Sequence, residues 1–312
     1  MSISLGSTNF GSIYLGSTKI GEAYLGSVKV YGSTPDPYNP LRLPPYTIRL
    51  RFTNGTTPTF KKGTATQVSS SPNVWDLTYE NPDWQNLVMQ QSNLVEVLGA
   101  NSTGVTNMFN LFYECRNLAD VALFDTSSAV NLGYMFCYAA VSTVPVYDTS
   151  NATEMVQMLS NCPNLTTPPA LDTSKATSIR GLFAVSAITS VPPLNLSSVT
   201  GNGLADLFYK CTALSTIPAI TIPSGITTIN DICCGCTSLR QLPNFSYSRT
   251  ITNVDRAFSG CINATSNIVS TYNNLVNLGS VTSHSYCFYN CGSNTTSGAA
   301  ELAQIPSGWK QK

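Results

Sequence analysis

The chain carries little charge for its length. Sixteen Lys and Arg residues and 16 Asp and Glu residues make up 10% of 312 residues, against roughly a quarter in an average globular protein. The formal net charge is zero. There is therefore no basic field to hold a phosphate backbone, and we expect no nucleic-acid partner.

Other absences exclude further classes. His284 is the only histidine, so a mechanism that needs two histidines is excluded. No apolar run approaches the roughly 18 residues of a spanning helix, and we expect no membrane insertion. The start, MSISLGSTNF, has neither a cationic nor an apolar stretch, so no Sec-type signal peptide is expected. No phosphate-binding, dinucleotide or metalloprotease motif occurs, so we predict no cofactor and no enzymatic activity.

Uncharged polar residues take the place of the missing charge. The chain has 37 Ser, 36 Thr and 27 Asn, together with 21 Gly and 18 Pro. These residue types favour turns and strands over charged amphipathic helices, so a mainly β fold is predicted. The length allows a large core and two or three domains.

The first 32 residues repeat with a period of ten, with Leu-Gly-Ser at residues 5–7, 15–17 and 25–27. Each copy predicts a short strand (Ile13–Leu15), a Gly-Ser turn and a second short strand (Lys19–Ile20). Such a segment cannot bury a core alone, so it needs other copies of the chain or a larger body. We predict an anchor; the alternative is a flexible leader. The candidate anchoring residues are Tyr14, Leu15, Gly16, Tyr24, Leu25 and Gly26.

Residues 33–45 form a Pro-rich linker, and residues 46–104 are predicted to be a small β-rich capping unit. Tyr46–Phe52 alternates between apolar and polar residues as a strand does, and Asn54-Gly55 offers a tight turn. Trp75 and Trp84 are the expected core anchors of this unit. A short helix is predicted over 83–90.

A second repeat, with a period of 23 to 25 that stretches to 30, covers residues 105–291. Its first column holds Phe112, Phe136, Leu159, Phe183, Phe208, Cys233, Phe258 and Phe288. Three residues later come Cys115, Ala139, Cys162, Ser186, Cys211, Cys236, Cys261 and Cys291. This pattern is typical of leucine-rich repeats, whose coils stack so that such columns become buried core ladders. We predict a solenoid of about eight coils and about 40 Å, with residues 292–312, including Trp309, as its C-terminal cap.

The repeat resembles the BspA-type leucine-rich repeat, as Leu111–Leu118 and Val144–Ser150 illustrate. The resemblance covers 105–291, or 187 of 312 residues. That family occurs in bacterial and protozoal surface proteins, where it is associated with adhesion, and in gut bacteriophage proteins. The segment Tyr14–Ile20 is similar to leaders of bacteriophage structural and fibre proteins. Exported BspA-type proteins are expected to begin with a signal peptide, whereas a virion protein leaves its host by lysis.

The ten cysteines allow three interpretations. Because Ala139 and Ser186 substitute for cysteine in the second column, we favour a small buried slot filled by free thiols. A disulfide framework is the first alternative, and sporadic oxidation between adjacent coils stays open. The second alternative is zinc, held by residues drawn from Cys233, Cys234, Cys236, His284, Cys287 and Cys291. About two coils separate these two groups, so four ligands are not expected to converge, and we predict no metal.

The Asp-Thr-Ser triplets at Asp125, Asp148 and Asp172 stack in one row. Each Asp is expected to cap backbone N–H groups in an Asx-type turn. Like charges about 5 Å apart would raise one another's pKa, which leaves a cation site open. Carboxylate catalysis is the alternative.

Four tyrosines share neighbouring repeat positions: Tyr113, Tyr138, Tyr209 and Tyr289. If they face solvent, they form an amphipathic adhesive surface suited to sugars or proteins. If they face inward, they are core residues. Both alternatives stay open.

These observations and the two resemblances together predict a bacteriophage virion structural protein, a head or tail fibre. It is expected to assemble in the host cytoplasm and to leave by lysis. Its N-terminal repeats would bind other virion proteins. The same repeats would also hold copies of the chain together as a homo-oligomer, for which a trimer is one option. Its solenoid would contact a host surface glycan or protein, and many copies per particle would multiply weak binding. The alternatives are a bacterial cell-surface adhesin and a glycan-cleaving fibre enzyme.

Overall fold

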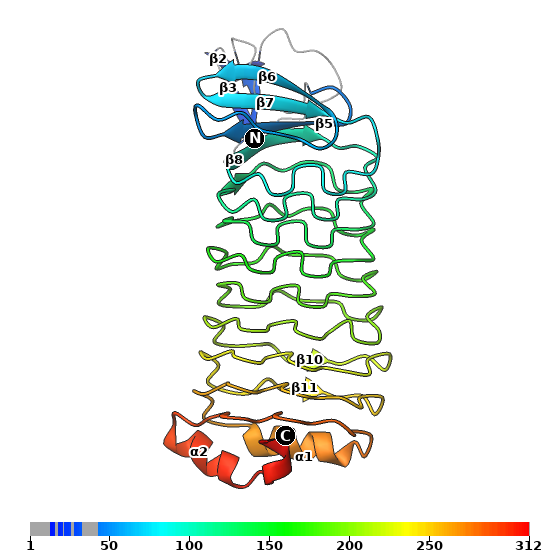
Figure 1. The fold of residues 1–312 in the computed structure, drawn as a ribbon, viewed down its shortest axis with the longest axis vertical. Coiled ribbons are helices and arrows are strands. Elements are labelled where there is room, and N and C mark those ends of the chain that lie inside the picture. Colours follow the sequence, from blue (N-terminus) through cyan, green and yellow to red (C-terminus); the bar gives the residue numbers. More distant parts are fainter. Residues whose placement is uncertain (1–12, 16–17, 21, 26–27, 33–42, 312) are drawn as a thin grey trace.

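The computed structural model describes residues 13–15, 18–20, 22–25, 28–32 and 43–311. Figure 1 shows a column with a β-sheet at one end, helices at the other, and stacked layers of chain between them. The fold is mainly β, as the composition predicts. Among the described helices, none is long and apolar enough to cross a membrane.

The N-terminal repeats form two antiparallel strand pairs, at the same end of the molecule as the sheet (Figure 1). Strand β1 (Ile13–Leu15) pairs with β2 (Thr18–Ile20), and β3 (Glu22–Leu25) pairs with β4 (Val28–Gly32). The two predicted short strands are therefore confirmed, while the Gly-Ser turn predicted between them lies outside the described residues. Of the candidate anchoring residues, Tyr14, Leu15, Tyr24 and Leu25 lie in β1 and β3, while Gly16 and Gly26 lie outside the described residues. Residues 33–42 of the predicted linker lie outside them too.

A five-stranded sheet follows, in the order β6-β7-β5-β8-β9. Its strands are β5 (Thr47–Phe52), β6 (Thr64–Ser70), β7 (Asn73–Thr78), β8 (Leu94–Asn101) and β9 (Asp120–Val121). The alternation in β5 buries Ile48, Leu50 and Phe52, which confirms the predicted strand. Gly55 adopts φ +77° in the predicted turn. That turn does not join paired strands, because β5 pairs with β7 and β8 and not with β6.

The predicted helix over 83–90 is wrong, because this segment forms the first layer of the stack. The N–H groups that a helix would use inside itself bond to the next layer instead: Trp84 to the Asn107 oxygen at 2.8 Å, and Val88 to the Leu111 oxygen at 3.2 Å. Trp84 is buried as expected, while Trp75 is only half-buried. Strand β8 pairs in parallel with β9, so the sheet runs directly into the stack.

We call each layer a coil and its first-column residue the anchor, with Val88 as the anchor of the added first coil. Around the anchor Phe112, the N–H groups of Asn110, Phe112 and Glu114 bond to oxygens of the next coil at 2.9 Å each. The N–H groups of Leu111 and Tyr113, which lie between them, turn back to oxygens three residues earlier at 3.1 and 3.2 Å. Each coil is therefore a run of β-turns that is tied to its neighbour at every second residue.

Two residues of each coil have positive φ, two places before and two places after the anchor. The first column holds Asn86, Asn110, Tyr134, Gln157, Gly181, Asp206, Asp231, Arg256 and Tyr286. The second holds Gln90, Glu114, Tyr138, Asn161, Val185, Lys210, Gly235, Gly260 and Asn290. A left-handed non-glycine residue costs about 1–2 kcal/mol, and the bonds between coils offset that cost.

The predicted core ladders are confirmed. The anchors Phe112, Phe136, Phe183, Phe208, Phe258 and Phe288 are fully buried, as are Cys115, Cys162, Cys211, Cys236, Cys261 and Cys291. Several anchor rings stack on the anchor ring of the next coil. The ring centres of Phe183 and Phe208 lie 6.2 Å apart, and their planes are 2° from parallel. On another side of the column, β10 (Ile220–Thr221) and β11 (Phe245–Ser246) pair in parallel.

The C-terminal end is helical. Helix α1 (Ile268–Asn277) lies between the last two anchors, which explains the longer final repeat. Helix α2 (Thr296–Ala303) and a 3-10 helix (Ser307–Trp309) follow. The N–H of Phe288 bonds to the Trp309 oxygen at 3.0 Å, so the terminal segment occupies the place of a further coil.

Candidate adhesive surface

The four predicted tyrosines all keep part of their rings exposed. Tyr113, Tyr138 and Tyr209 are half-buried, and Tyr289 is 46% exposed. They follow their anchors by one or two positions, and so lie between the buried anchor and the buried small residue three places after it. Their exposure favours the outward alternative over the core alternative.

Two of these tyrosines belong to one aromatic cluster. The rings of Tyr113 and Tyr138 lie 5.9 Å apart at 90°, and the ring of Tyr134 lies 6.3 Å from that of Tyr113. Phe109 adds a fourth ring, 5.4 Å from Tyr134. We call Phe109, Tyr113, Tyr134 and Tyr138 the aromatic patch. The sequence analysis missed Phe109 and Tyr134, although both precede their anchors by two or three positions in adjacent repeats.

Charged groups border the aromatic patch. The Arg116 guanidinium lies 4.9 Å from the centre of the Tyr138 ring and 3.3 Å from a Glu114 carboxylate oxygen. Burial raises the pKa of Tyr113, and the Glu114 carboxylate raises it further. The patch is therefore a neutral aromatic platform with a paired Arg–Glu edge, an arrangement common at binding surfaces.

The other two tyrosines lie elsewhere. Tyr209, three coils beyond Tyr138, has the Lys210 ammonium 5.0 Å from its ring centre. Tyr289 packs edge-on against Tyr286 at 5.7 Å near the C-terminal end. The four predicted residues therefore do not form one continuous surface, because the intervening coils carry other residue types at the same positions.

The cysteine ladder is built for packing. The thiol of Cys211 donates to the oxygen of Phe183, the anchor one coil earlier, at 3.0 Å, and Cys236 donates likewise to Phe208. All ten cysteines are free. Burial raises the pKa of the Cys115 thiol to about 12. Protonated, buried thiols are poor nucleophiles and poor metal ligands.

The Asp-Thr-Ser triplets form the predicted Asx-type turns. Asp148 accepts the Ser150 N–H at 3.0 Å and the Ser150 hydroxyl at 2.7 Å, and Asp125 does the same with Ser127. The expected raising of carboxylate pKa values is wrong. Hydrogen bonds from the serine lower the pKa of Asp125, Asp148 and Asp172. Repulsion from Asp148 raises the pKa of Asp125 and of Asp172, but this effect is smaller.

The threonines of these triplets link successive coils. The Thr149 hydroxyl, 1% exposed, donates to the Asp172 oxygen at 2.9 Å and accepts from the Asp172 N–H at 2.8 Å. Thr173 makes the same two contacts with Asn195. The triplet therefore has a structural role, and its threonine, not its aspartate, joins the coils.

His284 packs against the C-terminal cap. Its ring stacks on Trp309 at 4.2 Å, and its Nδ1 lies 3.1 Å from the Gly308 oxygen. Within the part of the chain that the structure describes, no three His, Cys, Asp or Glu side chains are placed to hold a metal ion.

Comparison with known proteins gives one match. A family model described as "Mycoplasma protein of unknown function, DUF285" matches residues 84–195, which is 112 of 312 residues. The match begins within the first coil, so this segment of the coil stack is what the chain shares with that family. No curated protein and no solved structure matches the chain.

Proposed function

We propose that this protein is a bacteriophage virion appendage, a head or tail fibre that displays an adhesive surface. Its stack is a leucine-rich-repeat solenoid of the BspA type, with about eight coils in the repeat segment. The N-terminal repeats attach it to the particle, and the solenoid contacts a glycan or protein of the host surface. Because many copies sit on one particle, weak individual contacts suffice.

The aromatic patch is the observation that carries the adhesive part. Phe109, Tyr113, Tyr134 and Tyr138 leave half-buried rings on adjacent coils, in a chain whose polar residues are mainly Ser, Thr and Asn. Aromatic rings supply large contact areas with little loss of conformational freedom, which is why binding surfaces are rich in them. With a net charge of zero, the chain favours close contact over long-range electrostatic attraction.

The N-terminal strand pairs support the attachment part. Each pair has two short strands, and a single hairpin of that size is marginal in water without a partner. They lie at the sheet end of the column, away from the C-terminal helices (Figure 1). Identical pairs from several copies of the chain would bury one another, which favours a homo-oligomeric attachment point with other virion proteins.

Removal of residues 1–32 tests the attachment part. The shortened chain is expected to stay folded and bind host cells as a free protein, yet to be lost from purified particles. Incorporation equal to that of the full chain would contradict the proposed anchor. Absence of the full-length protein from particles, with presence on a bacterial surface, would favour the adhesin alternative instead.

A further inference from the structure

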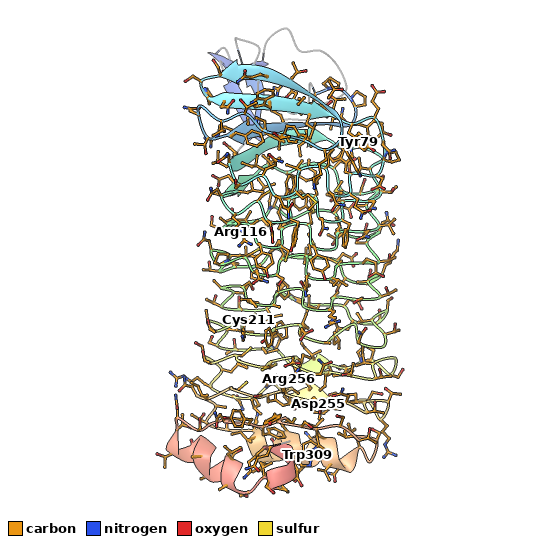
Figure 2. All side chains as sticks on the ribbon, in the orientation of Figure 1. Tyr79, Arg116, Cys211, Asp255, Arg256 and Trp309 are labelled. Carbon is orange, nitrogen blue, oxygen red and sulfur yellow. The ribbon has the colours of Figure 1, made fainter. Side chains whose placement is uncertain are left out.

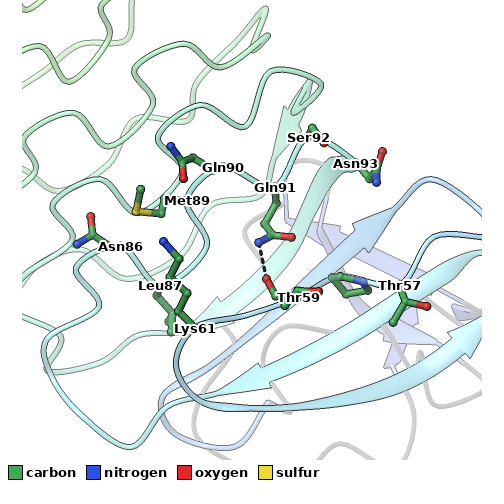
Figure 3. Close-up of a pocket in the computed structure, with 11 residues that line it drawn as sticks. Thr57, Thr59, Lys61, Asn86, Leu87, Met89, Gln90, Gln91, Ser92 and Asn93 are labelled. Carbon is green, nitrogen blue, oxygen red and sulfur yellow. Dashed lines mark hydrogen bonds between the residues drawn. The ribbon is translucent and has the colours of Figure 1, made fainter.

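A polar pocket lies where the sheet meets the stack. It lies between the segment that links β5 to β6 and the first coil, and its volume is about 350 Å³ (Figure 3). This is within the range of about 300–1,000 Å³ typical of small-ligand sites. The first coil contributes Asn86, Gln90, Gln91 and Asn93, so carboxamide groups dominate one wall.

Lys61 is the single charged residue among those that line the pocket. In Figure 3 its side chain extends towards the first coil, beside Leu87. Its neighbour Lys62 has a different role, because the Lys62 ammonium donates to the Gln85 oxygen at 3.0 Å and lies 5.7 Å from the Tyr79 ring centre. The pocket therefore combines one cation with several neutral amides and has no carboxylate in its lining.

The pocket continues into the aromatic patch. Asn86 accepts a hydrogen bond from Asn110 of the second coil at 2.9 Å, and Gln90 donates to Glu114 at 3.4 Å. Asn110 and Glu114 flank Tyr113 in the sequence, within one or three residues of it. One face of the first three coils therefore carries a cationic amide pocket that is followed by a platform of aromatic rings.

We propose that this face binds an acidic oligosaccharide, with a sugar carboxylate at Lys61 and neighbouring sugar rings on the aromatic patch. Amide groups pair with sugar hydroxyls, an ammonium pairs with a carboxylate, and the apolar faces of sugar rings pack on aromatic rings. A long polyanion is disfavoured, because the lining offers one cation and Glu114 lies at its edge. This inference rests on the proposed adhesive function and names its ligand class.

The test uses the full chain and a surface-immobilised panel of uronic-acid and sialic-acid oligosaccharides, each beside its carboxyl-reduced neutral counterpart. We expect binding to members of the acidic set and weaker binding to their reduced forms. Lys61→Met removes the ammonium but keeps the aliphatic chain, and is expected to weaken acidic binding about tenfold or more, as for a charged hydrogen bond. Lys62→Met is the matched control and is expected to retain binding.

Two further measurements separate the inference from the proposed function. Tyr113→Ala and Tyr138→Ala are expected to weaken binding to longer acidic oligosaccharides more than to acidic monosaccharides, while circular dichroism verifies the fold. Binding that is unaffected by Lys61→Met, confined to neutral sugars, or absent from the whole panel overturns the inference. If host cells still bind the full chain in that case, the adhesive function stands with a receptor other than the one inferred here. If host cells do not bind it either, both fail.

Discussion

The hydroxyl of Thr149 is predicted to stabilise the stack through two hydrogen bonds that join one coil to the next. Thr149→Val keeps the shape of the side chain but removes the hydroxyl. That hydroxyl donates to the Asp172 oxygen at 2.9 Å and accepts from the Asp172 N–H at 2.8 Å. Each hydrogen bond contributes about 1 kcal/mol to stability. The Asp172 N–H and carbonyl oxygen would also be left without this partner, so we expect the free energy of unfolding to fall by about 2–3 kcal/mol. In a domain of this size that lowers Tm by roughly 4–10 °C.

Two further variants make this prediction specific. Thr149→Ser keeps the hydroxyl and is expected to lose less than half as much stability as Thr149→Val. Thr167→Val alters an exposed threonine and is expected to leave Tm within about 1 °C of the original, as for most surface changes. Calorimetry and urea denaturation measure all three variants. A Thr149→Val protein as stable as the original, or a Thr149→Ser protein as unstable as Thr149→Val, would refute the role assigned to the hydroxyl.

Three other predictions concern titrating and charged groups. Because burial raises the pKa of the Cys115 thiol from 9.0 to about 12, this thiol should resist alkylation at pH 8 until the chain unfolds. The free energy of unfolding should also fall as the pH rises above 9.0, since the unfolded chain then loses the thiol proton and the folded chain keeps it. Rapid alkylation of Cys115 in the folded protein would disprove this. Because hydrogen bonds from Ser150 lower the pKa of Asp148 from 3.8, NMR titration should give this carboxylate a pKa below 3.8, and Ser150→Ala should raise that pKa. The contribution of Asp148 to stability should then be lost as the pH falls below 3.8. A pKa above 3.8 would show that the hydrogen bonds from Ser150 do not control this carboxylate. Arg256→Ala removes the guanidinium that donates two hydrogen bonds, each at 2.7 Å, to the Asp231 carboxylate, which is 4% exposed. Urea denaturation should show that the free energy of unfolding falls by about 2 kcal/mol. A fall below about 0.5 kcal/mol would contradict this prediction.

The buried columns could be predicted from sequence because burial restricts residue type at a fixed period. The column of Phe112 holds Phe in most later coils, the column of Cys115 holds only Cys, Ala or Ser, and both columns are buried. The Asx-type turns were predictable for a related reason, since the carboxylate of an Asp in a bend accepts the backbone N–H of the residue two places later. Each of these features depends on local chemistry that repeats with the coil.

Features that depend on bonds between coils could not be predicted in the same way. The left-handed positions accept residues as different as Tyr134, Gln157 and Arg256, so no residue type marks them. The first coil escaped notice because Val88 replaces the anchor aromatic and Gln91 replaces the cysteine. That exception positions Gln91 in the pocket, where its amide donates to the Thr59 oxygen at 2.8 Å (Figure 3).

The sheet and the helices close the stack at opposite ends, and side chains cover the column along its length (Figure 2). The aromatic patch lies between these ends and stays partly exposed. The later coils separate the aromatic patch from the C-terminal cap around Trp309, where a label can be attached without touching either proposed function.

Electron microscopy of purified phage particles that carry a gold label beside α2 tests the central proposal most directly. The account predicts gold on appendages of the particle, held away from its surface by the length of the stack. It also predicts that the gold disappears when residues 1–32 are deleted. Gold confined to the envelope of the bacterial cell, with none on particles, would contradict the account.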